Sequence, residues 1–404
     1  MKILFLTHAQ YITIALPKII EQVEVLAAMG HEVTLVATSR KNIWKMETFH
    51  KNGVRYIVSP SVLPGQWRHG ADVYDACRRA YFIARHFDYD IIHAVDSRPA
   101  VILPALFLKR IKKVPLVLEW MDLFSNGGTI SERSSKLYGA TFGKIESFFE
   151  TGFRNRADGA VALTDYLKDQ LIDGGFDRDK IHLHRMGCTV DTTYLTDKRT
   201  ARNDLDLSPD DVIIGYIGKI YRRDYELLIN SFKLLKKMHK EVRLVIVGSR
   251  LAGTKVRHPD IVHTGYLNGE KFNLYCNAID FFVLPLRKNP MNTARWPSKI
   301  SDYFRFAKPV VTTEVSDFKK IFNEHEIGIL SEDTPEAFSS AMDEMIRNRD
   351  RWETFGRNAY TYAKENLSWF HICENLIRFY ERILDNEYPF SRSESTVSND
   401  TERN

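Results

Sequence analysis

Short runs of β-branched and apolar residues alternate with longer helical patterns along almost the whole chain. This alternation is typical of a parallel sheet covered by crossover helices. The first series of strands is expected at 3–6, 32–37, 55–58, 91–95, 115–119, 159–163 and 181–183, and the second at 212–218, 242–247, 261–264, 281–284 and 310–312. The pattern therefore predicts an α/β protein with two doubly wound parallel sheets in series.

The length of the chain allows these two sheets to belong to separate domains. With 404 residues and 44% hydrophobic content, the chain can bury two cores of ordinary size. We expect an N-terminal domain over 1–190 and a C-terminal domain over 211–365. Turn-forming residues without a strong period mark 191–210 as a linker, and the Ser-rich stretch 388–404 is expected to be a disordered tail.

The apolar runs and the cysteines limit where the protein is expected to work. The longest apolar run, 99–108, is about half the length that a membrane span needs, and the N-terminal run lacks a small-residue cleavage site. The four cysteines lie far apart without C-x-x-C spacing, which favours reduced thiols in the cytosol. We therefore expect a cytoplasmic protein without a structural zinc site.

Positive charge is concentrated in the first half. Residues 1–199 hold 27 Lys and Arg against 22 Asp and Glu, whereas the rest of the chain is balanced, and the net charge is +5. A basic half can lie against anionic lipid headgroups, although an enzyme with neutral partners can carry the same excess. Peripheral contact with the inner face of a membrane stays open, and no nucleic-acid partner is expected.

The stretch 295–314 combines a helix start, a helix stop and a buried strand. Pro297 fits the first helical turn, where a missing N–H costs nothing. Ile300, Tyr303 and Phe304 then recur at helical spacing, so one side of the predicted helix faces the core.

A second side of this predicted helix carries Arg295, Lys299 and Asp302 close to its N-terminus, where N–H groups favour an anion. Two cations and a carboxylate suit a nucleoside diphosphate, because the cations bind phosphate oxygens and the carboxylate accepts from ribose hydroxyls. An amphipathic surface helix with ordinary charge pairs accounts for the same spacing, and the segment alone does not separate the two interpretations.

Gly218, Lys219, Arg222 and Arg223 follow the first strand of the second series and precede a helix. Ligands of open α/β sheets bind beyond the carboxyl ends of strands, so this loop is correctly placed for one, although a solvated loop is the alternative. The pairs Asp88/Asp90, Asp177/Asp179 and Asp204/Asp206 precede a strand or lie in turns, and we interpret them as structural rather than metal-binding.

Polar residues also emerge near the ends of two strands of the first series. Glu119 and Asp122 lie at the end of the strand 115–119, and His93 and Asp96 lie at the end of the strand 91–95. The carboxyl edge of the first sheet is therefore expected to carry polar groups. Asp122 could instead cap the segment that follows it.

Two motifs in the second half resemble one known family. Trp296-Pro-x-Lys299-x-x-Asp302-Tyr303, followed by Ala307-Lys-Pro-Val-Val311, resembles the nucleotide-sugar segment of the family-4 glycosyltransferases. Gly30-His-Glu-Val33 and the segment 186–191 resemble that family more weakly, and its frequent Gly-Gly pair after the first strand is missing. The resemblance implies the GT-B fold, in which two Rossmann-like domains face each other across a cleft, with a helix at 366–387 that crosses back to the first domain.

The resemblance also implies a reaction. It is the transfer of a sugar, with retention of configuration, from a nucleotide-sugar donor in the second domain to a glycan or lipid-linked acceptor in the first, without metal or cofactor. It assigns the donor ribose to Asp302. It assigns the donor diphosphate to Gly218, Lys219 and Arg223, with Arg222 as the alternative second base. It assigns the acceptor hydroxyl or the positive sugar carbon to Asp122, with Glu119 as a rival and with His93 and Asp96 lining the same cleft.

One position departs from the family pattern. Much of the family carries an acidic residue that contacts the donor sugar eight positions before Asp302, where this chain has Ala294. Asn289, Asn292 or backbone amides are then expected to hold the sugar. Two alternatives stay open: a catalytically inactive nucleotide-binding subunit of a polysaccharide machine, and a phosphorylase or sugar-nucleotide epimerase of the same fold.

Overall fold

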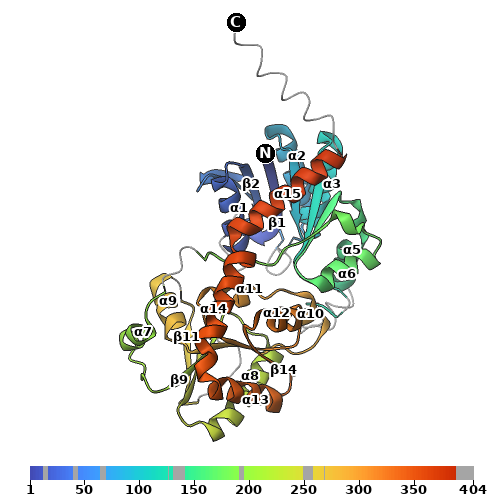
Figure 1. Cartoon of the computed structure of the whole chain (residues 1–404). Coiled ribbons are helices and arrows are strands. Elements are labelled where there is room, and N and C mark those ends of the chain that lie inside the picture. Colours follow the sequence, from blue (N-terminus) through green and yellow to red (C-terminus); the bar gives the residue numbers. More distant parts are fainter. Residues whose placement is uncertain are drawn as a thin grey trace. The chain divides into compact units, whose positions relative to one another are not determined.

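The structure is a computed structural model that describes residues 1–11, 17–39, 44–63, 70–125, 127–130, 142–190, 195–248, 258–267 and 269–387. The chain divides into two compact units (Figure 1). Unit 1 comprises Met1–Arg185 and Trp369–Asn404, and unit 2 comprises Met186–Ser368. The predicted disordered tail, 388–404, lies outside the described residues.

The sheet of unit 1 has the strand order β3-β4-β2-β1-β5-β6-β7-β8, and all its pairings are parallel except that of β3 with β4. Strand β3 was not predicted, because its sequence Glu-Thr-Phe-His-Lys has little apolar alternation and its residues are mostly exposed. The strands are β1 (Lys2–Gln10), β2 (Glu32–Thr38), β3 (Glu47–Lys51), β4 (Val54–Ser59), β5 (Ile91–Val95), β6 (Leu116–Trp120), β7 (Gly159–Ala162) and β8 (Ile181–Leu183).

Helices cover both faces of this sheet, so successive residues of a central strand enter different cores. In β1, Ile3 and Phe5 pack beneath α1 and α15, whereas Leu4 and Leu6 pack beneath α2 and α3. In Figure 1 the helix α15 runs along one face of unit 1 beside α1. The helices are α1 (Pro17–Ala28), α2 (Val73–His86), α3 (Pro99–Lys112), α5 (Phe142–Gly152), α6 (Asp165–Asp173) and α15 (Trp369–Glu387).

The sheet of unit 2 has the order β11-β10-β9-β12-β13-β14, and its pairings are all parallel. The short edge strand β14 was not predicted. The strands are β9 (Val212–Ile217), β10 (Val242–Val247), β11 (Ile261–Gly265), β12 (Phe281–Leu284), β13 (Val310–Thr313) and β14 (Gly328–Ser331). The helices are α7 (Lys198–Asp204), α8 (Arg222–Met238), α9 (Gly269–Ala278), α10 (Pro290–Ala294), α11 (Ser298–Arg305), α12 (Phe318–His325), α13 (Pro335–Arg347) and α14 (Trp352–Tyr362).

The predicted linker is wrong in part, because 198–204 form the helix α7, which packs against α9. Arg202 is 2% exposed, and its guanidinium donates to Asp280 at 2.6 Å and to the carbonyl oxygens of Ala278 and Pro209. These bonds anchor the segment to unit 2. This anchoring of the segment was not predicted from its polar sequence, because the buried residue is an arginine rather than an apolar residue.

Both sheets contain a point at which the strand order reverses. In unit 1 it lies between β1 and β5, and in unit 2 between β9 and β12. The connections on the two sides of such a point diverge, which leaves room for a ligand beyond the carboxyl ends of the two strands.

Candidate functional site

The loop after β9 opens the carboxyl edge of the unit 2 sheet. Gly218 has φ +86°, and its N–H donates to the Val247 carbonyl oxygen at 2.7 Å. A Cβ on the neighbouring Gly248 would come within 2.6 Å of the Gly218 oxygen. The two loops can pass this closely because Gly248 has no side chain, and the positive φ of Gly218 is one that glycine adopts readily. Lys219 follows directly at the edge of the sheet.

Three predicted cations come together here. The Lys299 ammonium donates to the Lys219 carbonyl oxygen at 3.0 Å and lies 5.1 Å from the centre of the Tyr216 ring. The Arg295 guanidinium and the Lys219 ammonium lie 4.9 and 5.5 Å from the ring of Tyr221. Aromatic faces attract cations without neutralising their charge, so this arrangement suits a polyanionic ligand.

A buried carboxylate that the sequence analysis missed holds Arg295 in place. Asp224 is 3% exposed, lies 3.4 Å from the Arg295 guanidinium and accepts from the Arg287 N–H at 2.9 Å and the Asn292 amide at 3.2 Å. Burial raises the pKa of Asp224, although these donors oppose the shift. The sequence feature that could have identified Asp224 is its place in the first turn of α8, just after the loop of Gly218 and Lys219.

Burial and positive neighbours also change the ionisation of Lys299. Burial lowers the pKa of its ammonium to about 7, with the charge of Arg295 acting in the same direction, whereas Asp224 and Asp302 oppose the shift. A negatively charged ligand would favour the protonated form again. The binding of an anion at this site is therefore expected to be coupled to proton uptake.

Several details differ from the expected helix. Arg295 lies before α11 rather than on it, and Pro297 is the N-cap residue rather than part of the first turn. Asp302 lies one turn along α11, where it pairs with Arg305 at 3.4 Å. Its assignment to the donor ribose stays a prediction. Arg223 begins α8 together with Arg222, and both are exposed, so exposure does not decide which of them is the second base.

The residues expected to hold the sugar in place of the missing acidic side chain differ in burial and in their contacts. Ala294 is fully buried in α10. Asn292 is also fully buried, and its amide donates to Asp224 and to the Arg287 carbonyl oxygen, so the expectation that it grips a sugar is wrong. Asn289 accepts from the Asn292 N–H at 2.9 Å as the N-cap of α10 but remains only partly buried.

In unit 1, the side chains of His8, Asp96 and Asp122 lie where β1, β5 and β6 end. Asp96 has φ +63° and accepts from the Met121 N–H at 3.3 Å, and its carboxylate lies 3.8 Å from His8 Nδ1. Burial raises the pKa of Asp96 well above its ordinary value, and the nearby charge of Asp122 adds to the shift. His8 was not predicted as a site residue, because sequence spacing does not bring it near Asp96.

The loop that carries Asp122 is clamped from α5. The buried Glu150 accepts from the backbone N–H groups of Phe124 at 2.9 Å and Ser125 at 2.6 Å, and from the Trp120 indole at 3.0 Å. The same indole donates to the Asp122 carbonyl oxygen at 2.9 Å. Asp122 itself is only partly buried.

The expectation that Glu119 and His93 line the cleft is wrong. In their strands, both residues lie on the same face as the core residues that α15 covers. Their side chains therefore point into this core rather than out at the edge of the sheet. Glu119 Oε2 lies 2.7 Å from His93 Nε2, and His93 Nδ1 lies 2.6 Å from the Tyr380 hydroxyl of α15. Burial would raise the pKa of Glu119, but His93 and His184 outweigh it and the pKa falls below its usual value.

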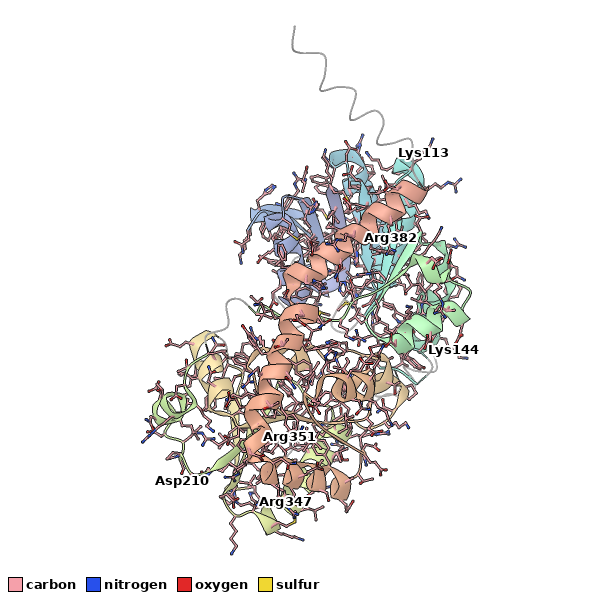
Figure 2. The ribbon with its side chains drawn as sticks, viewed as in Figure 1. Lys113, Lys144, Asp210, Arg347, Arg351 and Arg382 are labelled. Atoms are coloured by element: carbon pink, nitrogen blue, oxygen red, sulfur yellow. The ribbon has the colours of Figure 1, made fainter. Side chains whose placement is uncertain are left out.

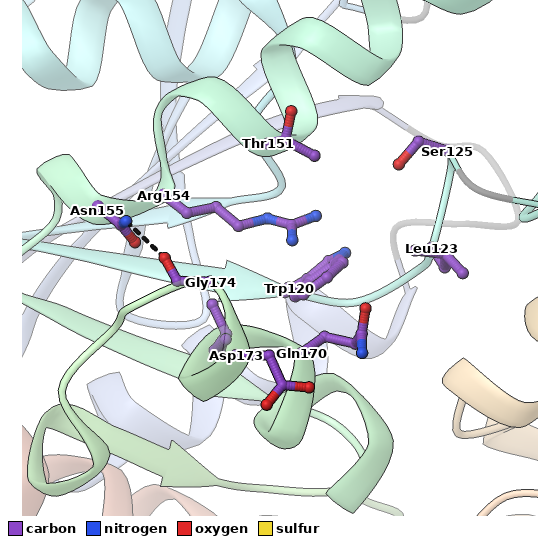
Figure 3. Close-up of a pocket in the computed structure, with 10 residues that line it drawn as sticks. Trp120, Leu123, Ser125, Thr151, Arg154, Asn155, Gln170, Asp173 and Gly174 are labelled. Atoms are coloured by element: carbon purple, nitrogen blue, oxygen red, sulfur yellow. Dashed lines mark hydrogen bonds between the residues drawn. The ribbon is translucent and has the colours of Figure 1, made fainter.

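A pocket of about 290 Å³ lies beside the Asp122 loop, between α5 and α6 (Figure 3). The Arg154 guanidinium covers the face of the Trp120 indole, 3.0 Å from the ring centre, and pairs with Glu150 at 3.2 Å. Gln170, Thr151 and Asn155 supply further polar groups along the wall. The wall therefore combines amide, hydroxyl and guanidinium groups, which can hydrogen-bond a ligand with several hydroxyl groups.

Two of the three Asp pairs make contacts within the protein. Asp88 pairs with Lys112 at 2.8 Å, Asp90 accepts from the Lys2 N–H at 2.6 Å, and Asp177 caps a short helix by accepting from the Asp179 N–H. Among the described residues, no group of three or more His, Cys, Asp or Glu side chains could hold a metal ion. Nor does any helix of the described segments combine the length and apolar composition needed to cross a membrane.

Comparisons with known proteins place both units in one family. Residues 211–348 match the family described as "Glycosyl transferases group 1", and residues 19–187 match the "Glycosyl transferase 4-like domain". The two matches together take in about three quarters of the chain. The chain belongs to the group 1 glycosyltransferases.

One relative of this glycosyltransferase chain is a protein of Bacillus subtilis (strain 168) named as a teichuronic acid biosynthesis glycosyltransferase. It is 23% identical over 237 residues, which cover 56% of each chain. The chain spans about half the length of the curated relatives it matches.

Two solved structures resemble the whole glycosyltransferase chain. Sucrose-phosphate synthase from Thermosynechococcus elongatus has a TM-score of 0.72 at 15% identity and covers 95% of this chain and 99% of its own. Anabaena HepE, solved in complex with UDP and glucose, has a TM-score of 0.70 at 15% identity and covers 95% and 100%. These likenesses confirm the predicted GT-B fold with two Rossmann-like domains.

Proposed function

We propose that this group 1 glycosyltransferase transfers a sugar from a nucleotide-sugar donor, bound by unit 2, to a glycan or lipid-linked acceptor bound by unit 1. Retention of configuration and independence of metal ions are part of the proposal. Contact with a membrane surface, expected from the basic first half, also belongs to it. The observation that carries the proposal is the cluster of Lys219, Arg295 and Lys299 beyond β9.

This cluster suits the leaving group of the reaction. When the bond between sugar and diphosphate breaks, negative charge accumulates on the departing phosphate oxygens. Cations already held beside that position stabilise the charge without reorganisation of solvent. Asp224 holds Arg295 in its place, and the Lys219 carbonyl oxygen holds Lys299. HepE, which has a similar fold, was solved with UDP, and a nucleoside diphosphate site in this chain is consistent with that finding.

In unit 1 we assign Asp122 to the acceptor hydroxyl or to the positive sugar carbon. Glu150 fixes its loop, and the pocket over Trp120 lies beside it. The polar lining of that pocket supports an acceptor with several hydroxyl groups. Asp96 and His8 lie beside the same edge and are assigned to support Asp122 rather than to bind substrate.

The test is the release of nucleoside diphosphate from a panel of nucleotide sugars, with and without acceptor extracts. We expect release with at least one donor, unchanged activity in the presence of a chelator, and retention of the anomeric configuration in the product by NMR. Lys299→Ala should reduce the rate, whereas Lys237→Ala, which removes an exposed cation at the far end of α8, should not.

The remaining outcomes separate the alternatives. Formation of sugar phosphate on addition of inorganic phosphate would indicate a phosphorylase, and interconversion of the sugar nucleotide would indicate an epimerase. Tight binding of a nucleoside diphosphate without turnover of any donor would indicate an inactive subunit. Loss of activity with chelator would contradict the metal-free mechanism.

A further inference from the structure

Three positive charges lie close together beyond β9 in unit 2, and carboxylates balance them only in part. Asp224 pairs with Arg295 at 3.4 Å. Among the described residues, neither the Lys219 ammonium nor the Lys299 ammonium forms an ion pair. Burial lowers the pKa of Lys299 most, and the charges of Arg295 and Lys219 lower it further, so the cations repel one another. Some other contact must therefore keep the exposed Lys219 in the cluster.

The faces of two tyrosine rings supply the missing contacts. The Arg295 guanidinium lies 4.9 Å and the Lys219 ammonium 5.5 Å from the centre of the Tyr221 ring. The Tyr216 ring lies 5.1 Å from the Lys299 ammonium, and its hydroxyl donates to the Lys219 carbonyl oxygen at 3.0 Å. All three cations are thus within the distance of about 6 Å over which a ring attracts a cation. For the Lys219 ammonium, the ring of Tyr221 is the one polar or ring contact within the described residues.

Tyr221 occupies a position at which a tyrosine has no local advantage. It is the N-cap residue of α8, where serine, threonine, aspartate and asparagine are favoured because their side chains accept from the first N–H groups of a helix. The side chain of Tyr221 makes no such capping hydrogen bond. It is also only partly buried, so a place in the core does not explain it. What this position does provide is a ring within reach of both Lys219 and Arg295.

We infer that Tyr221 is a positioning residue of the diphosphate site, whose ring holds Lys219 and Arg295 where they stabilise the departing phosphate oxygens. The inference rests on the proposed function, because it concerns the same leaving group. A carboxylate in this place would also hold the two cations but would cancel their charge, whereas a ring leaves the charge and the N–H groups available. The cations are then in place before the ligand binds, and their repulsion does not have to be overcome at that moment. Tyr216 has the same relation to Lys299.

The test changes the face of the ring while its shape stays nearly the same. Tyr221 is replaced by phenylalanine and then by phenylalanines with increasing numbers of ring fluorines, which weaken the attraction of the face for a cation. Calorimetry measures the affinity of the full chain for UDP, GDP, ADP and inorganic pyrophosphate. We expect Tyr221→Phe to bind like the unchanged protein, the fluorinated rings to bind progressively less tightly, and Tyr221→Leu to bind about tenfold less tightly. The turnover number should fall in the same order with the donor that the unchanged protein uses.

Two control variants lie elsewhere on unit 2. Tyr275→Leu removes a partly buried tyrosine from α9, a helix that packs against α7. Arg347→Leu removes an exposed cation at the end of α13 (Figure 2). Neither change should alter the affinity for the four anions. A thermal melt of each variant checks that unit 2 is folded, and Tyr221→Phe separates loss of the hydroxyl from loss of the ring.

Equal affinity along the fluorinated series would overturn the inference, because the ring would then act by packing alone. Equal or higher affinity of Tyr221→Leu would overturn it as well, because the ring would not hold the cations for the ligand. No binding of any of the four anions by the unchanged protein would overturn the inference and the phosphate site together. Failure of the proposed function gives a different result: the variants bind nucleoside diphosphate in the graded order, but the unchanged protein turns over no donor. That result would support the role of Tyr221 and contradict the transfer reaction.

Discussion

The carboxyl edges of the two sheets use ionisable side chains differently. In unit 2, Lys219 and Lys299 contact aromatic faces and a carbonyl oxygen, which orient a cation but do not cancel its charge. In unit 1, Glu119 and His93 lie beneath the edge of the sheet and bond each other inside the core. A polar residue at the end of a strand therefore indicates a binding site only when its partners leave its charge available.

The largest effect that this comparison predicts is on stability. Glu119→Ala removes one partner of a buried charged network and leaves His93 and His184 without it, so the free energy of unfolding should fall by about 3–5 kcal/mol. Glu119→Gln keeps an acceptor and should cost less. Chemical denaturation measures both. An unchanged stability together with lost turnover would make Glu119, not Asp122, the catalytic carboxylate.

The next effect concerns Asp122, which is expected to act on the substrate rather than on the fold. Asp122→Asn should lower the turnover number on the order of 10²–10³-fold, because a carboxylate aimed at developing charge is lost. Its melting temperature should stay close to that of the unchanged protein, since Asp122 is only partly buried. Steady-state kinetics and a thermal melt on the same preparation test both statements. Full activity of Asp122→Asn would remove it from the mechanism.

A smaller effect is expected on donor affinity. Lys299→Ala and Lys219→Ala should each weaken the binding of nucleoside diphosphate by about 1.5–3 kcal/mol, the value of a hydrogen bond to a charged group. Calorimetry with the nucleoside diphosphates of the donor panel measures this, with Lys237→Ala as the control. Unchanged affinity in both variants would contradict the assignment of the phosphate site.

The smallest effect is on the pH dependence of binding. The pKa of Lys299 is lowered to about 7 in the free protein, and a bound diphosphate raises it, so the complex binds more protons above pH 7. Affinity should therefore fall as pH rises above about 7, by at most about tenfold per pH unit. Calorimetry in buffers of different ionisation enthalpy should show proton uptake. Lys299→Met should remove the slope, and a slope that survives this change belongs to another group.

The predictable part of the molecule followed from local patterns. Strands such as β5 (Ile91–Val95) and β12 (Phe281–Leu284) were predicted to the residue, because a short apolar run between turn signals is typical of a buried strand. Arg295 and Lys299 were predicted to lie together from their spacing near a helix start, and Lys219 was predicted as a site residue from its place after the first strand of the second series. The edge strand β3 was missed because its exposed sequence has little apolar alternation. The helix α7 was missed because the ion pair of Arg202 with Asp280 anchors it, and local patterns do not report such a contact.

The unpredicted parts of the site depend on contacts between distant segments. Asp224 reaches Arg295 from a helix 71 positions away, and His8 reaches Asp96 from another strand. The burial of Glu119 depends on α15, which lies far along the chain and covers one particular side of β6. Sequence spacing gives the direction of a side chain within an element but not the element that will cover it.

The return of α15 to unit 1 has a consequence for biosynthesis. Cys373, Leu376, Phe379 and Ile383 of this helix complete the core that begins at Ile3 and Phe5, and Tyr380 completes the hydrogen bonds of His93. During translation the N-terminal sheet emerges from the ribosome with this side uncovered. The C-terminal unit is synthesised before α15. It is therefore the first of the two units whose strands and helices have all left the ribosome. The half of the protein that is encoded first is therefore the one whose folding finishes last.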